Sequence, residues 1–132
     1  MKFNHIGYVV ENLKNSVRGF KSLGYESSDC FIDINQNIEI VLLNKDFSPI
    51  IELIHPIDEF NSLNRFINDG QKTVSYHIAY EVIDIRETMS FLRKEGFVPC
   101  MNISKAVAFN DIPFVFLNNH QTGLIELLEK ND

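Results

Sequence analysis

Two histidines and two glutamates occur in this sequence in a pattern that suits a metal ion. His5 and His77 each open a similar segment, and Glu52 and Glu126 each lie within an apolar run. Buried carboxylates are costly unless they are paired or bind a metal, and two neutral imidazoles with two carboxylates make a good site for a divalent ion. These residue types fit zinc, nickel, cobalt or manganese. Four protein ligands leave two positions of an octahedron for water or substrate.

An internal repeat selects the same four residues. Residues 5–25 match residues 77–97 without a gap, at an offset of 77 − 5 = 72. The identical pairs are His5/His77, Ile6/Ile78, Tyr8/Tyr80, Val10/Val82 and Gly24/Gly96. Further along, the run IELI at 51–54 returns as IELL at 125–128, at an offset of 74, so Glu52 matches Glu126. The chain therefore consists of two related halves.

Each half is predicted to open with a strand and a helix. Alternating apolar residues indicate strands at 3–10 and 76–82. Asn12 and Asp84 are typical helix N-caps, with Glu87 placed for a capping box, while Gly24 and Gly96 suit the position after a helix. Apolar runs predict later strands at 38–43, 50–54, 114–117 and 124–128, with one more around 28–34 or 98–104.

These elements predict an α+β fold. We expect one domain over residues 1–132, with repeat 1 at about 1–57, a linker at about 58–74 and repeat 2 at about 75–130. Two tandem βαβββ modules would form a cupped mixed sheet with the helices on its convex side. A short helix is predicted within the linker at 60–68, closed by Gly70.

Side-chain alternation then predicts which residues face the concave side. If the helices cover the face of the Ile-x-Tyr-x-Val residues, both histidines point to the opposite side. The alternation within 51–53 and 125–127 turns Glu52 and Glu126 to that side as well. Gly7 and Ala79 are small and would leave room there for a ligand. The alternative is that the histidines and glutamates bond only to each other, without a metal.

Composition limits the kinds of partner. With 45% hydrophobic and 23% charged residues the chain is globular, and its net charge of 12 − 18 = −6 argues against a nucleic acid partner. No run approaches the ~20 apolar residues of a membrane span, and 6–10 is too short for a signal-peptide core, so we expect a cytoplasmic protein without a membrane partner. Cys30 and Cys100 lack metal-type spacing and are expected to be reduced.

Other candidates are weaker. His55 and His120 lie outside the repeat-related positions, and we expect surface or rim roles for both. Phe109, Phe114 and Phe116 could line an apolar substrate channel, although core packing is the more frequent role of phenylalanine on strands.

The segments HIGYVVENL, IELIHP, YHIAYEV and GLIELLE resemble the vicinal oxygen chelate (glyoxalase/bleomycin resistance/dioxygenase) superfamily, most closely its methylmalonyl-CoA epimerases and short bacterial glyoxalase I (lactoylglutathione lyase) type. The resemblance implies a metal held by His5, Glu52, His77 and Glu126, and often a homodimer. It also implies proton transfer next to the carbonyl of a thioester or hemithioacetal through a metal-chelated enediolate. Glu126, and then Glu52, are the candidate catalytic carboxylates.

One position departs from the epimerase pattern. The resemblance implies a separate catalytic glutamate 16–17 residues before the second ligand, but counting back from Glu52 reaches Gln36 and Asn35. Neither side chain is a general base at neutral pH. Epimerase activity would therefore need Asp33 or Glu39 as a substitute.

The sequence therefore predicts a metal-dependent isomerase or lyase, and two other functions are considered. Resistance proteins of this fold bind small molecules without a metal, but retention of all four ligand types argues against that role. A ring-cleaving dioxygenase would use iron with His5 or His77 and one glutamate, and such enzymes usually have a longer chain.

Overall fold

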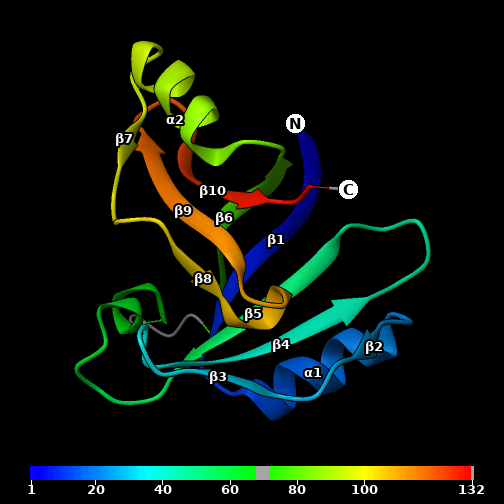
Figure 1. Ribbon diagram of the computed structural model, residues 1–132. Helices are drawn as coiled ribbons and strands as arrows, with labels where there is room; N and C mark the ends of the chain where they lie inside the picture. The colour runs from blue at the N-terminus through cyan, green and yellow to red at the C-terminus, as the bar shows by residue number, and fades with distance from the viewer. Residues whose placement is uncertain (68–71, 132) are drawn as a thin grey trace. The chain divides into compact units, whose positions relative to one another are not determined.

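The computed structural model describes residues 1–67 and 72–131. Their contacts divide the chain into two units: unit 1 comprises Met1–His5 and His77–Asp132, and unit 2 comprises Ile6–Tyr76. The boundary falls inside strands β1 (Lys2–Val10) and β6 (Thr73–Val82), so both strands contribute to both units (Figure 1). Unit 1 thus combines the second repeat with the first residues of the chain.

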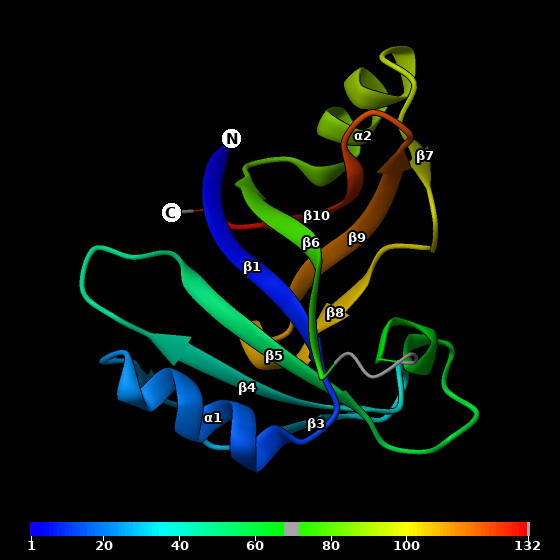
Figure 2. The same ribbon diagram turned by 180° about the vertical axis from the view of Figure 1, so that it is seen from behind.

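Unit 2 carries the elements of the first repeat. They are α1 (Leu13–Ser22), β2 (Glu26–Ser27), β3 (Phe31–Asp33), β4 (Ile38–Asn44), β5 (Ile50–Pro56) and the 3₁₀ helix η1 (Ser62–Ile67). The strand order is β2-β4-β5-β1, and β3 also pairs with β4. Strands β2, β3 and β5 all run antiparallel to β4. Helix α1 contacts β2, β4 and β5 and lies along β4 in Figure 2.

The core of unit 2 forms between α1 and one face of these strands. Val17 and Phe20 of the helix pack against a cluster that includes Val10, Val41 and Leu53. Ile6 and Tyr8 join the same cluster, so the predicted helix-covered face of β1 is confirmed.

Unit 1 repeats this arrangement with the second half of the chain. Its further elements are α2 (Ile85–Lys94), β7 (Val98–Pro99), β8 (Ser104–Ala106), η2 (Val107–Phe109), β9 (Ile112–Asn119) and β10 (Gly123–Glu129). The strand order is β6-β10-β9-β7, with β8 also paired to β9. Strand β10 pairs parallel to β6 and antiparallel to β9. Helix α2 covers β9 and β10, where Leu92 packs with Val82, Val115 and Leu127.

Both helices end as their glycines predict. Gly24 and Gly96 have φ values of 97° and 93°, in the left-handed region that glycine adopts without steric cost. The N–H of Gly24 donates to the Lys21 carbonyl at 3.0 Å, and the N–H of Tyr25 donates to the Phe20 carbonyl at 3.2 Å. These two bonds form a Schellman motif that satisfies the last carbonyls of α1.

The α+β class and the mixed strand pairing are confirmed, with two differences of detail. The additional strand predicted for each half is divided into two short strands, β2 and β3 in the first half and β7 and β8 in the second. In the first half Ser28 interrupts the ladder, because its Oγ accepts the Leu42 N–H at 2.9 Å. The predicted linker helix begins at Ser62 rather than at residue 60, and it is a 3₁₀ helix. The side-chain amide of Asn64, within this helix, donates to the carbonyls of Asp58 and Asn61. Asn68 and Gly70 lie outside the described residues.

Two further expectations concern the surface. Cys30 and Cys100 are both free and exposed, which agrees with the expected reduced state. Within residues 1–67 and 72–131, no helix has the length and hydropathy needed to span a membrane.

The Asp84 N-cap predicts a measurable stability loss on substitution. Its Oδ1 accepts the Glu87 N–H at 3.0 Å, which satisfies one of the free donors of α2. Asp84→Ala should lower the free energy of unfolding by about 1 kcal/mol, seen as a lower urea midpoint with an unchanged slope. Asp84→Asn keeps the acceptor and should retain most of the stability. An Asp84→Ala midpoint equal to that of the parent would contradict the capping role.

Candidate metal centre

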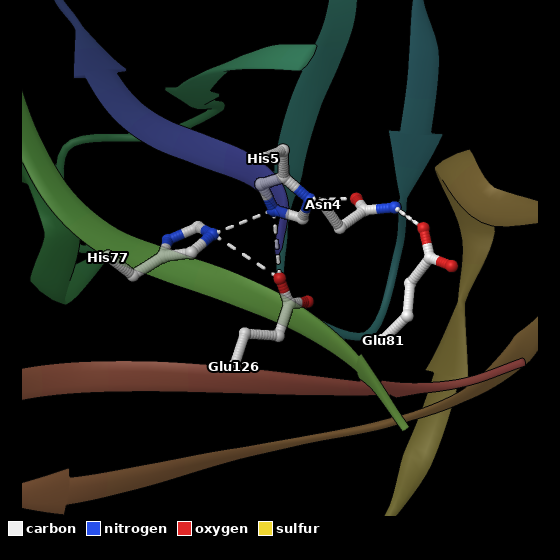
Figure 3. Close-up of polar contacts among 5 residues, drawn as sticks. All are labelled: Asn4, His5, His77, Glu81 and Glu126. Atoms are coloured by element: carbon white, nitrogen blue, oxygen red, sulfur yellow. Dashed lines mark hydrogen bonds and ion pairs between the residues drawn. The ribbon is translucent and has the colours of Figure 1, made fainter. Parts of the chain in front are cut away.

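Three of the four predicted ligands converge within unit 1. The Nε2 atom of His5, on β1, lies 3.0 Å from Nε2 of His77, on β6. Oε2 of Glu126, on β10, lies 2.9 Å from the first of these nitrogens and 3.3 Å from the second. Figure 3 shows the three side chains pointing toward one another. All three are buried, with exposed fractions of 0%, 3% and 3%.

Strand register explains this convergence. Strands β6 and β10 pair in parallel with Glu126 opposite Ala79, which lies two residues beyond His77 and therefore on the same face. Ile125 and Leu127 face the other way, into the core beneath α2. Glu126 is thus held on the site side of β10 by its apolar neighbours, as the alternation predicts.

The donor set fits a divalent ion. Metal bonds to imidazole nitrogen and carboxylate oxygen are about 2.0–2.2 Å long, so two adjacent ligands of an octahedral ion lie about 3 Å apart. The three distances of 2.9, 3.0 and 3.3 Å match such a spacing. Two imidazoles and a carboxylate are also ligands that zinc, nickel, cobalt and manganese accept.

Aromatic rings surround the histidines. Phe109 stacks on the His5 ring, with centroids 5.0 Å apart and an interplanar angle of 10°. Phe116 lies opposite Glu126 on β9 and meets the His77 ring edge-on at 5.1 Å. Both phenylalanines are half-buried. They therefore form apolar walls of the ligand cluster.

Two neighbouring residues have packing roles instead. Phe114 is 2% exposed and belongs to an apolar cluster with Ala79 and Leu128, which makes it a core residue. Ala79 is itself fully buried in that cluster. Its small side chain is packed among apolar residues of that cluster.

Asn4 and Glu81, which the repeat does not single out, bond to this cluster. Oδ1 of Asn4 lies 2.6 Å from Nδ1 of His5, and Nδ2 of Asn4 donates to Oε2 of Glu81 at 2.8 Å (Figure 3). The sequence holds a signal for both residues. Glu81 lies four residues after His77, and therefore on the same face of β6, and Asn4 directly precedes His5. These residues form an outer layer around the histidine.

The fourth predicted ligand, Glu52, lies in unit 2. It pairs with Leu42 across β4 and β5 and is 5% exposed. Its neighbours Ile51 and Leu53 pack into the core beneath α1, so Glu52 faces the other side of β5. The predicted orientation of this carboxylate on its strand is therefore confirmed.

The two acids considered as substitute bases also lie in unit 2. Asp33 is 2% exposed and accepts two hydrogen bonds from Gln36, from its backbone N–H at 3.1 Å and its side-chain amide at 2.8 Å. Glu39 lines a pocket beneath α1 with Val41 and Cys30. Desolvation, and secondarily the Glu39 charge, raise the pKa of the Cys30 thiol. Asp33 thus closes a turn, and Glu39 occupies the helix side of β4.

The remaining two histidines each have surroundings of their own. His55 is half-buried and bonds through Nδ1 to the Val10 carbonyl at 3.1 Å, within unit 2. His120 is exposed in the turn between β9 and β10. The surface or rim roles expected for both agree with these positions.

Known proteins resemble this chain over nearly its whole length. The Dictyostelium discoideum protein named mitochondrial methylmalonyl-CoA epimerase is 26% identical over 132 residues, covering 98% of this chain and 78% of the relative. The methylmalonyl-CoA epimerase structure from Mycobacterium tuberculosis has a TM-score of 0.85 at 23% identity and covers 99% of this chain and 89% of that one. A Streptomyces coelicolor methylmalonyl-CoA epimerase in complex with 2-nitronate-propionyl-CoA has a TM-score of 0.85 at 16% identity, with coverage of 100% and 99%.

The structural matches establish the fold, and a family model establishes the family. The model described as Glyoxalase/Bleomycin resistance protein/Dioxygenase superfamily matches residues 4–116, which is most of the sequence. His5 and His77, which open the two copies of the repeat, both lie within that match. The chain therefore belongs to the glyoxalase/bleomycin resistance protein/dioxygenase superfamily, the group that its sequence motifs resemble.

Proposed function

We propose that this chain is a metal-dependent enzyme that transfers a proton at a carbon next to a carbonyl, with an epimerase-like reaction on a CoA thioester as the first candidate. The observation that carries the proposal is the convergence of His5, His77 and Glu126 at 2.9 to 3.3 Å in a buried setting. The relatives named methylmalonyl-CoA epimerase, one of them solved with a CoA thioester analogue, support the substrate class.

Four residues are proposed to hold the ion. His5, His77 and Glu126 contribute the atoms that converge in unit 1. Glu52 is proposed as the fourth ligand because it is the repeat equivalent of Glu126 and is likewise a buried carboxylate. A divalent ion bound there, such as nickel, cobalt, zinc or manganese, supplies a Lewis acid that polarises the substrate carbonyl.

Glu126 is the proposed proton carrier. Its Oε2 faces both imidazoles, and a carboxylate has a second oxygen that can accept a proton from carbon. Phe109 and Phe116 present apolar surface beside the histidines, which limits access of water to the reacting carbon. Glu52 is the second candidate for this role.

A glyoxalase-I-like lyase is the second candidate function. The observation that favours it concerns the residues at the position where the resemblance implies the separate base of the epimerases. Asn35 and Gln36 occupy that position, and Asp33 is engaged by Gln36. A reaction served by one carboxylate, on a hemithioacetal substrate, would need no further base.

The proposal of a cytoplasmic homodimer rests on the sequence and the resemblance. Light scattering of the purified protein tests whether it is a dimer.

Removal of one imidazole should abolish stoichiometric metal binding. In His77→Ala a ligand is lost and Glu126 loses one of its two nitrogen neighbours. We expect metal affinity to fall by more than the ~10–100-fold loss that follows removal of an outer partner. Metal analysis of the untagged protein, with chelator competition, measures this. His120→Ala, which alters an exposed histidine, is the matched control, and equal metal content in both variants would refute the site.

Substitution of Glu126 should separate metal binding from proton transfer. Glu126→Gln keeps an oxygen ligand but removes the proton acceptor, so the rate of proton exchange should fall by ~10²–10⁴-fold in protein that still contains metal. Incorporation of solvent deuterium into methylmalonyl-CoA measures exchange on the thioester. Formation of lactoylglutathione from methylglyoxal and glutathione measures the alternative reaction.

The same pair of assays distinguishes the candidate functions. Activity on the thioester alone supports the epimerase-like reaction, and activity on the hemithioacetal alone supports the lyase. An active Glu126→Gln enzyme would exclude Glu126 as the proton carrier. Inactivity of the metal-loaded parent on both substrates would refute both reactions as proposed.

A further inference from the structure

A chain of polar contacts leads from an exposed lysine to the His5 ring. Nδ1 of His5 lies 2.6 Å from Oδ1 of Asn4, whose Nδ2 lies 2.8 Å from Oε2 of Glu81. The other oxygen of Glu81 lies 4.0 Å from Nζ of Lys130. All four residues belong to unit 1, and Figure 3 shows Asn4 between the imidazole and the carboxylate.

The chemistry of these groups fixes the direction of each hydrogen bond. An ionised carboxylate only accepts, so the NH₂ group of Asn4 must face Glu81. The amide oxygen of Asn4 then faces His5, and Nδ1 of His5 must donate to it. With a hydrogen on Nδ1, a metal ion can bind the ring only at Nε2, the atom that faces His77 and Glu126. In the metal-free protein Nε2 can itself donate to the acceptor-only carboxylate of Glu126, 2.9 Å away.

The repeat shows that this arrangement is specific to His5. At the offset of 72 residues, the counterpart of Asn4 is Tyr76 and the counterpart of Glu81 is Val9. Residues 5–10 and 77–82 otherwise share four identities, His5 included. The pair of Asn4 and Glu81 is therefore not repeated in the sequence, although the histidine is.

We propose that Asn4 and Glu81 are positioning residues that keep a hydrogen on Nδ1 of His5, so that only Nε2 is open to a metal ion. Glu81 sets the orientation of the Asn4 amide, and the amide oxygen holds the hydrogen on Nδ1. For metal affinity the inference rests on the proposed function, whereas the hydrogen on Nδ1 is a property that the metal-free protein also has. Loss of such an outer partner typically weakens metal binding ~10–100-fold.

Glu81→Gln tests the orientation step. A glutamine amide both donates and accepts, so the Asn4 amide is free to turn and His5 can place its hydrogen on Nε2. Two-bond ¹⁵N–¹H correlation spectra of the metal-free protein, at about two pH units above the ordinary imidazole pKa, report both tautomers. We expect a new population of His5 that lacks a hydrogen on Nδ1, with no equal change at His77, and ~10–100-fold weaker zinc binding by chelator competition. Glu87→Gln, at an exposed glutamate of α2, should change neither.

A double variant tests the pattern of donors and acceptors. N4D/E81Q exchanges the amide and the carboxylate, so the new carboxylate at position 4 accepts from both His5 and the new amide. It should restore the Nδ1–H tautomer and most of the zinc affinity. Thermal unfolding of each variant shows which ones remain folded.

The outcomes separate this inference from the proposed function. An Nδ1–H tautomer retained in folded E81Q, an equal change at His77, or failure of the double variant to restore the tautomer would overturn the positioning role. A parent that binds no zinc would refute the metal centre while the spectra still decide the tautomer. Should E81Q unfold, the spectrum of N4D/E81Q is compared with that of the parent. A hydrogen retained on Nδ1 of His5 then supports the inference, and its loss overturns it.

Discussion

The structure of unit 1 depends on the burial of one carboxylate. Glu126 is 3% exposed on a strand whose adjacent side chains pack beneath α2, and burying an ionised group without compensation costs several kcal/mol. Two imidazole nitrogens within 3.3 Å supply the nearest polar partners, and a divalent ion would supply a full opposite charge. The strands that carry His5 and His77 must therefore hold their register against β10.

Parallel pairing of β6 and β10 meets this requirement. A parallel pair needs a long connection, and here α2, β7, β8 and β9 form it, covering the strands and adding the phenylalanines that contact the histidines. The helix core and the ligand cluster lie on opposite faces of the same strands. A one-residue slip of β10 would place Ile125 or Leu127 among the imidazoles and Glu126 in the core, so the apolar packing and the site fix the same register.

The repeat made much of this predictable from the sequence. Identity at the histidines, and alternation around Glu52 and Glu126, predicted which face each side chain takes, because both signals are local and recur twice. What differs between the halves was not predicted. Asn4 and Glu81 replace the residue types found at their counterparts, Tyr76 and Val9, and their contact joins two strands far apart in sequence. In η1, the side chain of Asn64 donates to two backbone carbonyls. Such bonds compete with the backbone hydrogen bonds of an α-helix, and the spacing of apolar residues does not predict them.

A symmetric ligand set does not by itself define a reaction, because equivalent ligands do not show which of them exchanges a proton with the substrate. In the described structure that difference resides in the surroundings of the ligands. His5 has a stacked phenyl ring and an amide held by a carboxylate, His77 meets a phenyl edge, and Glu126 faces Phe116 across the strand pair. Duplication thus accounts for the ligands, and the residues that broke the duplication account for the proposed chemistry.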